Sequence, residues 1–364
     1  MKKSHTALDG LFRYAESLKF GEVHIRFDQK TGLRAIIAIH SLKRGPAIGG
    51  CRCVPYISAD AAFEDAIRLA CMMSYKAAIS QLNHGGAKAV LMRPAVIKDR
   101  KAWFEAFGDF VHELGGRYIT AVDSGTLLSD MDIINERTPW VTCTTRENVP
   151  NDPSPLTALG VRRGIEAAAR FALQKDLSGL HVSIQGAGHV GYFLAQELVA
   201  HGARISICDI NPALVERSVS ELGAKAVSPD DIYDVQSDVF APCALGAVLN
   251  RDSIERLKAA KVRIIAGSAN NQLAHQRYAE LMHEHGILYA PDFVINSGGL
   301  IYSAAVYDHA DVPRAKNQVE NIYQTLTDIF QKSAEDNLNT HEVAMRLARE
   351  RLMETSGSAF CNQT

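Results

Sequence analysis

Lys88 and Lys76 are the residues whose types and spacing most suggest chemistry. Lys88 ends the run Asn-His-Gly-Gly-Ala-Lys at 83–88, and Lys76 lies in Ser-Tyr-Lys-Ala-Ala at 74–78. Glycine lets a ligand approach the backbone closely, so an amine beside it can be held against that ligand. A nearby cation and burial both favour a neutral lysine, which can act as a base or a nucleophile near neutral pH. The alternative is that both are solvated surface lysines, although their neighbours are mainly small or apolar.

The first part of the chain is predicted to position these side chains on strands and helices. Apolar or alternating runs predict strands at 22–27, 33–40, 88–92 and 117–122. Helical spacing predicts a helix at 58–76, which carries Lys76 near its C-terminal end, and another at 103–114, ended by two glycines. Asp123 directly follows the last of these strands. The end of a strand is a typical position for residues that act on a ligand.

From about residue 142 the pattern changes. A polar segment with three prolines leads into a predicted helix at 156–173, and strands are then predicted at 181–184, 204–208, 239–241, 262–266 and 287–289. Helical segments lie between them, and 313–351 is helical. This alternation favours a parallel, doubly wound α/β sheet. We therefore expect a first domain at 1–145, a second at 146–334, and a C-terminal helix, about 335–364, that packs back on the first.

A glycine-rich turn indicates that the second domain binds a dinucleotide. It follows a predicted strand, opens a helix, and has the spacing that lets a pyrophosphate reach the helix N-terminus. Asp209 ends the next strand, where a carboxylate receives the ribose hydroxyls and repels a 2′-phosphate, which favours NAD over NADP. The alternative is a turn without a ligand. The cofactor-binding residues expected from this motif are Gly186, Ala187, Gly188, His189, Val190 and Gly191.

Composition narrows the class of protein. The chain has 364 residues and a formal net charge of −2, with no basic stripe, so nucleic acid is not an expected partner. No apolar run is long enough for a membrane span, and the N-terminus lacks the features of a secretory signal, which predicts a cytoplasmic protein. Seven cysteines without framework or metal-site spacing predict reduced structural thiols and no metal site.

Seven motifs, in order, link the chain to a known family. They lie at 45–52, 75–78, 85–88, 117–123, 153–157, 267–272 and 291–299. Together they resemble the amino acid dehydrogenases of the glutamate, leucine, phenylalanine and valine family, most closely the leucine/phenylalanine branch, over nearly the whole chain. The resemblance implies an oxidoreductase that uses NAD to deaminate an L-amino acid to its 2-oxo acid and ammonia, and runs the reverse reaction. It also implies a homo-oligomer and a cleft between an N-terminal α/β substrate domain and a Rossmann-type NAD-binding domain.

The resemblance also implies roles for individual residues. Lys88 would be the general base that activates water, Asp123 would relay protons to and from the nitrogen, and Lys76 would hold the substrate carboxylate. Lys76 would also help to keep Lys88 neutral. The remaining implied contacts are Gly49, Gly50 and Asn270 with substrate, and Thr157 and Asn271 with the cofactor.

Four positions bear on the side chain of the substrate. Ile48 occupies the position of a lysine that binds the side-chain carboxylate in glutamate enzymes of the family, so an acidic substrate is disfavoured. Ala121 and Leu300 match positions of an apolar pocket, although each could be plain core packing. Ser303 stands where the leucine enzymes have an aliphatic residue. Leucine or another branched-chain amino acid is therefore the expected substrate, with phenylalanine, tryptophan or another bulky amino acid as the alternative.

Two segments depart from the family pattern. Residues 146–152 replace a small, glycine-rich loop, and are expected to be a surface turn or else to alter cofactor affinity. His84 precedes the glycines before Lys88 and is expected to be structural rather than catalytic.

A non-catalytic NAD-binding sensor is a second possible class of function for this chain. The presence of Lys76, Lys88 and Asp123 argues against a sensor, because these residues would carry out catalysis.

Overall fold

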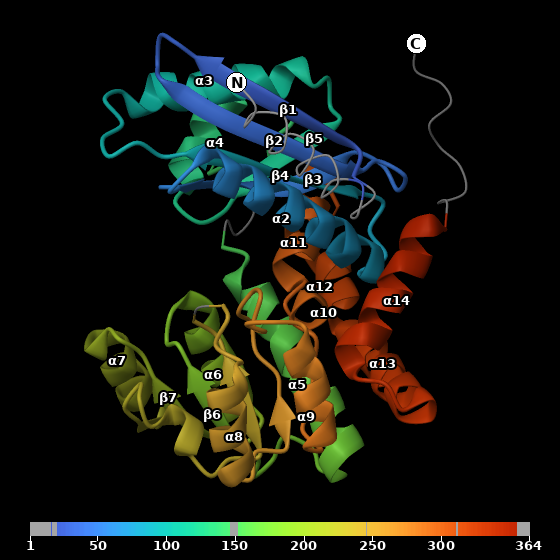
Figure 1. Cartoon of the computed structure of the whole chain (residues 1–364). Coiled ribbons are helices and arrows are strands. Elements are labelled where there is room, and N and C mark those ends of the chain that lie inside the picture. Colours follow the sequence, from blue (N-terminus) through green and yellow to red (C-terminus); the bar gives the residue numbers. More distant parts are fainter. Residues whose placement is uncertain (1–15, 17–19, 146–151, 245, 311, 355–364) are drawn as a thin grey trace, which may run out of the picture. The chain divides into compact units, whose positions relative to one another are not determined.

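The chain forms two compact units (Figure 1). The computed structural model describes residues 16, 20–145, 152–244, 246–310 and 312–354. The first unit contains the described residues within 1–151, Ser303–Ala310 and those from Ala348 onward, and the second contains Asp152–Tyr302 and the described residues of Asp311–Leu347. Two helices, α11 (Gly298–Tyr307) and α14 (Thr340–Met353), cross this division.

The first unit is built on a five-stranded sheet. Its strand order is β1-β2-β4-β3-β5. β2 pairs antiparallel with both β1 and β4, whereas β3 lies parallel to both β4 and β5. The strands are β1 (Glu22–Asp28), β2 (Leu33–Ser41), β3 (Ala47–Val54), β4 (Gly85–Met92) and β5 (Tyr118–Val122).

Helices cover both faces of this sheet (Figure 1). One face packs on α3 (Arg100–Glu113) and α4 (Leu128–Asn135) around a core that includes Trp103 and Phe107. The other face packs on α2 (Ala59–Ile79), whose buried alanines contact β2 and β4. Ser58 caps α2, since its side chain accepts a hydrogen bond from the Ala61 N–H. The predicted helices at 58–76 and 103–114 thus correspond to α2 and α3.

β3 and α4 were not among the elements predicted from the sequence. Glycine weakens strand patterns, and β3 carries Gly49 and Gly50. A Cβ on Gly49 would lie 1.8 Å from the carbonyl oxygen of Ala87, so β3 and β4 can pair here only because the side chain is missing. The glycines before Lys88 also lie inside a strand, and a Cβ on Gly86 would lie 2.0 Å from the backbone nitrogen of Ser74 on α2. These glycines therefore leave room for the protein's own backbone.

The second unit is built on a six-stranded parallel sheet. Its order, β11-β10-β9-β6-β7-β8, is that of a doubly wound dinucleotide fold, with the reversal between β6 and β9. The strands are β6 (His181–Gln185), β7 (Arg204–Cys208), β8 (Lys225–Ala226), β9 (Val239–Pro242), β10 (Ile264–Ile265) and β11 (Leu288–Tyr289). This agrees with the doubly wound sheet expected from the sequence.

Helices surround this second sheet. Among them α5 contacts α6 and α13, and a core around Phe240 and Met282 fills the β9–β11 side. Besides the helix pieces that cross the division, the helices of this unit are α5 (Ser154–Leu173), α6 (His189–Ala200), α7 (Pro212–Leu222), α8 (Arg251–Ala259), α9 (Arg277–Glu284), α10 (Asp292–Ile295), α12 (Val312–Glu320), α13 (Ile322–Asp336) and the short 3₁₀ helix η1 (Ile232–Asp234).

The C-terminal part divides differently from the sequence-based boundary at 334/335. Residues up to Leu347 belong to the second unit, and the segment Ser303–Ala310 belongs to the first. Side-chain contacts within the first unit hold both returning pieces, since Asp308 binds His84 and Arg44 Nη1 donates to the carbonyl oxygen of Arg351.

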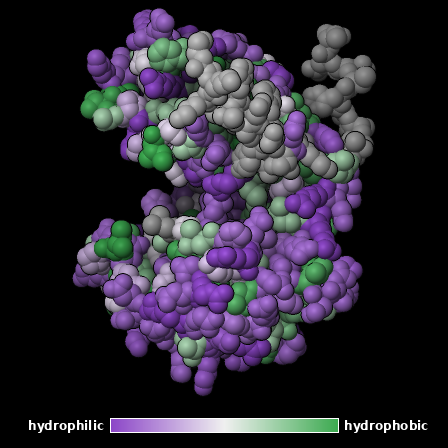
Figure 2. Space-filling model, in the orientation of Figure 1, coloured by the Kyte–Doolittle hydropathy of each residue, from purple (hydrophilic) through white to green (hydrophobic). Residues whose placement is uncertain are grey.

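Figure 2 shows a largely hydrophilic face of the molecule, on which hydrophobic residues form small, separate patches. In the part of the chain that the structure describes, no helix combines the length and apolarity needed to cross a membrane.

Candidate active site

Lys88 and Asp123 form a buried ion pair in the first unit. Lys88 Nζ lies 2.5 Å from Asp123 Oδ2, and the Lys88 residue is 6% exposed. The odd-numbered residues of β3 and β4 face the core beneath α3, so Gly50 and Lys88 face the opposite side. The pairing register puts Gly50 beside Ala121 on β5, and by continuation of the β3–β4 register beside Lys88 as well. The Lys88 side chain therefore reaches across a position without a side chain to meet Asp123.

Gly50 makes this approach possible. A Cβ on Gly50 would lie 2.7 Å from Asp123 Cβ and 2.9 Å from the Val122 carbonyl oxygen. Any larger residue would displace the carboxylate. The sequence predicted that Gly50 contacts the substrate through its backbone. The structure adds a packing role, because the absence of a side chain at Gly50 leaves room for Asp123.

Asp123 is held as an anion. Burial alone raises the pKa of its carboxyl, but the neighbouring charges of Lys88 and Arg52 outweigh burial and lower the pKa below its usual value. Arg52 Nε lies 3.5 Å from the same oxygen, Oδ2, that Lys88 contacts. The charge that the structure puts against Lys88 is thus a carboxylate, whereas the sequence-based argument had assigned Lys76 as the charge acting on it.

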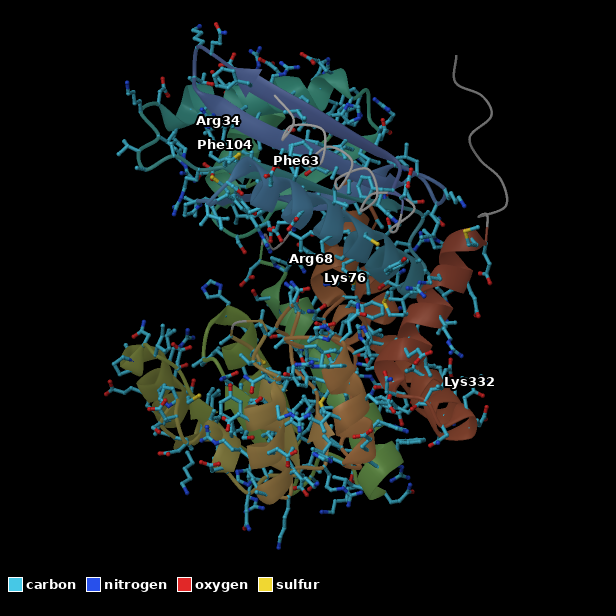
Figure 3. All side chains as sticks on the ribbon, in the orientation of Figure 1. Arg34, Phe63, Arg68, Lys76, Phe104 and Lys332 are labelled. Atoms are coloured by element: carbon cyan, nitrogen blue, oxygen red, sulfur yellow. The ribbon has the colours of Figure 1, made fainter. Side chains whose placement is uncertain are left out.

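Lys76 lies in the last turn of α2 and is half-buried. Figure 3 shows Arg68 and Lys76 along the same edge of α2. Asp65 lies on the same stripe of α2 as Arg68 and Lys76, because Asp65 and Lys76 are eleven residues, or about three turns, apart. Asp65 in turn binds Arg52 on β3, so the stripe faces the β3 side of the sheet.

Two of the expected pocket residues lie on the same sheet face as Lys88. Ile48 is 1% exposed and pairs with Gly86 and Ile119, and Ala121 is 7% exposed and pairs with Gly50. Strand alternation puts both on the face of Lys88 and Asp123. The buried ion pair therefore has apolar neighbours.

Ser303 and Leu300 lie on α11, on either side of the division between the units. The Ser303 hydroxyl lies 3.3 Å from Cys143 Sγ, and Thr142 Oγ1 donates to the Ser303 carbonyl oxygen. The hydroxyl is therefore engaged by the protein itself. Leu300 is half-buried.

His84 is a structural residue in this arrangement. It is 3% exposed, and its ring nitrogens lie 3.2 Å from the Pro46 carbonyl oxygen and 3.0 Å from Asp308 Oδ2. The imidazole thus ties the segment Ser303–Ala310 to the start of β3. Of the unusual loop at 146–152, residues 146–151 lie outside the described residues.

The three glycines of the glycine-rich turn in the second unit have different surroundings. It joins β6 to α6 beside the point where the strand order reverses. Gly186 has a φ of +106°, which glycine adopts most readily. A Cβ on Gly188 would meet nothing within 4 Å, whereas a Cβ on Gly191 would lie 2.0 Å from the Gly186 carbonyl oxygen. The turn is thus closed by its first and third glycines and open at its second.

Two backbone hydrogen bonds hold the Asp209 carboxylate beside this turn. Its Oδ2 accepts the Ala187 N–H at 2.8 Å, and its Oδ1 accepts the Asn211 N–H at 2.9 Å. At the start of α6 the His189 side chain is 84% exposed, and Val190 is half-buried. The carboxylate therefore stands at the end of β7 next to an open helix N-terminus.

The other expected contacts lie on helix α5 and on the loop that carries Asn270 and Asn271. Thr157 on α5 donates to the Pro153 carbonyl oxygen, and its Oγ1 would lie 2.9 Å from a Cβ on Gly299. Asn270 is exposed and its Oδ1 accepts from Asn296 Nδ2 at 2.9 Å, while Asn271 is half-buried with a φ of +51°. Both segments belong to the same unit as the glycine-rich turn.

Comparison with known proteins identifies the family. The model described as "Glu/Leu/Phe/Val dehydrogenase, dimerisation domain" matches residues 19–140, and the model described as "Glutamate/Leucine/Phenylalanine/Valine dehydrogenase" matches residues 213–356. The chain is 45% identical to a leucine dehydrogenase of Bacillus cereus over 96% of this chain and 95% of that protein. The chain belongs to the glutamate/leucine/phenylalanine/valine dehydrogenase family. It is an amino acid dehydrogenase, and the resemblance inferred from seven motifs is confirmed.

Other members of the glutamate/leucine/phenylalanine/valine dehydrogenase family are similar over comparable lengths. A valine dehydrogenase of Streptomyces coelicolor is 40% identical, and the match covers 90% of each chain. The crystal structure of L-tryptophan dehydrogenase from Nostoc punctiforme superimposes with a TM-score of 0.83 at 38% identity, over 95% of this chain and 100% of that chain. The two-domain α/β fold with a Rossmann-type second domain is thereby confirmed.

Arg52 is the residue of this site that sequence reasoning did not assign. It ends the glycine-rich motif at 45–52, and its position two residues after Gly50 puts it on the same strand face as Lys88 and Asp123. The two-residue spacing of Gly50 and Arg52 could have identified Arg52 from the sequence, since alternate residues of a strand share a face. This signal was missed because β3 was not predicted as a strand.

Proposed function

We propose that this dehydrogenase catalyses the NAD-dependent oxidative deamination of an apolar L-amino acid, leucine or another branched-chain amino acid, to its 2-oxo acid and ammonia, and the reverse amination. The observation that carries the proposal is the Lys88–Asp123 ion pair on a sheet face that also carries the buried apolar side chains of Ile48 and Ala121. Similarity to leucine dehydrogenases supports the substrate class.

The residues of the second unit fit a dinucleotide. The open position at Gly188 and the free N-terminal end of α6 leave room for a pyrophosphate, and Asp209 stands where ribose hydroxyls would be received. Gly186, Ala187, Gly188, His189, Val190 and Gly191 would hold it, with Thr157 and Asn271 as further contacts. A carboxylate at Asp209 disfavours a 2′-phosphate, which supports NAD. When bound, the nicotinamide supplies the hydride acceptor.

The proton transfers fall to the first unit. As the substrate amine becomes an imine, water adds to its carbon, and the Lys88 amine removes a proton from that water. Asp123 accepts the proton across the 2.5 Å contact and passes it to the departing nitrogen, which leaves as ammonia. Lys76 would bind the substrate carboxylate as a cation, and Gly49 and Gly50 would contact the substrate through their backbone, with Asn270 contributing from the second unit.

The side-chain pocket would be apolar. Ile48, Ala121 and Leu300 would contact the substrate side chain, and Ile48 offers no charge to a second carboxylate, which would be costly to bury unpaired. Because the Ser303 hydroxyl already contacts Cys143, it is not required to hydrogen-bond a substrate. Similarity to L-tryptophan dehydrogenase favours bulky aromatic amino acids as the second candidate.

The chain would act as a cytoplasmic homo-oligomer that assembles through its first unit. This unit matches a family domain named for dimerisation, and its edge strand β1 exposes two large apolar side chains, Ile25 and Phe27. An exposed, apolar edge strand is a ready site for pairing with a second chain.

The test is NADH formation by the purified enzyme with each L-amino acid in turn, and NADH oxidation with each 2-oxo acid plus ammonia. We expect branched-chain substrates to give the highest kcat/KM, and NAD to be preferred over NADP. Lys88→Ala should lower kcat by at least ~10²-fold while the dissociation constant for NAD is unchanged. Full activity in Lys88→Ala would refute the base role, and NAD binding without turnover of any substrate would favour a sensor.

A further inference from the structure

Arg52 lies between two carboxylates of the first unit. Its Nη1 donates to Asp65 Oδ2 at 2.9 Å, and its Nε lies 3.5 Å from Asp123 Oδ2. The Arg52 side chain is 20% exposed. One guanidinium therefore links a helix residue to the carboxylate that contacts Lys88.

Asp65 is itself fixed from three directions. Besides Arg52, its Oδ2 accepts the Tyr56 hydroxyl at 2.7 Å, and its Oδ1 accepts Arg68 Nη2 at 2.7 Å. Burial raises the pKa of Asp65, but the Tyr56 hydroxyl and the charges of Arg52 and Arg68 outweigh it and lower the pKa. Asp65 is thus a fixed anion that sets the orientation of the Arg52 guanidinium.

Arg52 and Lys88 act on the same oxygen of Asp123. Both contacts to Oδ2 are ion pairs, so two positive charges hold the carboxylate there. A guanidinium keeps its proton at all working pH values, so Arg52 cannot itself relay one. Its effect must come through the position and the proton affinity of Asp123.

We propose that Arg52, oriented by Asp65, is a positioning residue for the deamination reaction that holds the Asp123 carboxylate against Lys88 and limits how readily it accepts the relayed proton. The inference rests on the proposed function, in which Asp123 is the relay. Arg52 itself transfers no proton in this proposal. It should nevertheless affect the pH dependence of turnover, which a merely structural residue would not.

The charged and titratable groups that interact with Asp123 let this pH dependence be assigned. Lys88 on β4 and Arg52 on β3 contact its carboxylate, with Asp65 behind Arg52, and the Cys51 thiol and the Tyr118 hydroxyl on the other face of the sheet are affected by its charge. Burial raises the pKa of Cys51 to about 12 and raises that of Tyr118 well above its usual value, so neither titrates under acidic conditions. Arg52 and Arg68 both lower the pKa of Asp65, so an acid limb that moves on changing Arg52 but not on changing Arg68 reports on Asp123.

The test compares Arg52→Gln with Arg68→Gln. Both remove one positive charge from the contacts of Asp65, but only Arg52 reaches Asp123. We expect Arg52→Gln to lower kcat by about 10²-fold, and to move the acid limb of the kcat profile up by about one pH unit, because loss of a cation raises the pKa of a carboxyl. Arg68→Gln should stay within about twofold of the parent, since the Arg68 side chain is 44% exposed and its ion pair is with Asp65 rather than Asp123. NAD affinity should be unchanged in both.

Arg52→Lys provides a second arm if Arg52→Gln does not fold. An ammonium restores the charge but not the two-sided contact, so the acid limb should stay near that of the parent while kcat falls. A parent-like profile and kcat in Arg52→Gln, or equal effects of Arg52→Gln and Arg68→Gln, would overturn the inference. Asp123→Asn and Lys88→Ala in the same assay separate the two proposals. If both keep turnover, the proposed site is wrong, whereas if both lose it and Arg52→Gln does not, only the role of Arg52 fails.

Discussion

The glycines of the 186–191 turn have three different surroundings. Gly186 occupies a left-handed conformation, Gly191 leaves room for a carbonyl oxygen, and Gly188 borders open space. These roles follow from the known fingerprint and could be predicted from the sequence. The glycines of β3 and β4 could not, because the groups that crowd them, such as the Ala87 carbonyl and the Asp123 side chain, come from other strands.

Substitution at Gly188 should affect the cofactor and not the fold. Gly188→Ala adds a methyl group that meets no protein atom within 4 Å, whereas in Gly191→Ala the methyl would lie 2.0 Å from the Gly186 carbonyl oxygen. We expect Gly188→Ala to keep the parent melting temperature and to raise the KM for NAD by at least ~10-fold. Gly191→Ala, in contrast, should lower the melting temperature. Equal NAD affinity in Gly188→Ala and the parent would contradict a pyrophosphate at this turn.

The buried thiols should resist alkylation in the folded protein. Burial raises the pKa of Cys51 to about 12, and that of Cys53 and Cys208 to about 11. At pH 8 the thiolate fraction is then about 10⁻³ to 10⁻⁴, and the thiolate is the reactive form. We expect mass spectrometry to find these three cysteines unmodified by iodoacetamide after an hour, and modified after unfolding in urea. Rapid native labelling of Cys51 would contradict the burial described for β3.

At the scale of elements, most of the first unit followed from local pattern, and β3 and α4 did not. α4 is short, and Leu127, which precedes it, is not a typical capping residue. Its first turn instead depends on Asp130, which is 1% exposed and accepts the Leu127 N–H at 2.7 Å. Arg100 on α3 completes the arrangement, with Nε and Nη2 donating to the two oxygens of Asp130 at 2.7 and 2.6 Å. The partner lies thirty residues away, beyond the reach of local pattern.

Asp130→Asn should therefore destabilise the first unit markedly. The change removes the carboxylate charge that Arg100 contacts where Asp130 is 1% exposed, and losing hydrogen bonds to a charged group costs about 2 kcal/mol. Asp109→Asn is the matched control, because Asp109 contacts Arg137 in the same two-pronged way between α3 and the segment after α4 but is 46% exposed. Urea unfolding at constant m-value should show a lower free energy of unfolding for Asp130→Asn and little or no change for Asp109→Asn. Equal losses would show that burial of Asp130 does not govern its contribution.

At the scale of the whole molecule, the division into units was only partly predictable. The strand order of the second sheet follows from the alternation of strands and helices. The return of Ser303–Ala310 to the first unit does not, because its anchors are His84 and Thr142, more than 160 positions away in sequence. Within α11 the helical pattern continues unchanged across the division.

The two units should respond differently to the dinucleotide. Both tryptophans, Trp103 and Trp140, belong to the first unit, so their fluorescence reports on that unit alone. A ligand that binds only the folded second unit stabilises it by about 2.7 kcal/mol at a hundred times its dissociation constant. We expect added NAD to raise the midpoint of thermal unfolding followed by far-UV circular dichroism more than the midpoint followed by tryptophan fluorescence. Equal shifts would show that the units unfold as one.

The hydrogen bond from the Ala187 N–H to Asp209 has a consequence for engineering and for evolution. The same carboxylate that would select the cofactor also holds the backbone of the glycine-rich turn. A substitution of Asp209 that admits a 2′-phosphate would also leave the Ala187 N–H without its acceptor. The change in preference between NAD and NADP would therefore be accompanied by a less ordered glycine-rich turn. A change of cofactor in this lineage would therefore need a second substitution that supplies a new acceptor for Ala187, and single-step libraries at Asp209 would mostly recover poorer enzymes rather than switched ones.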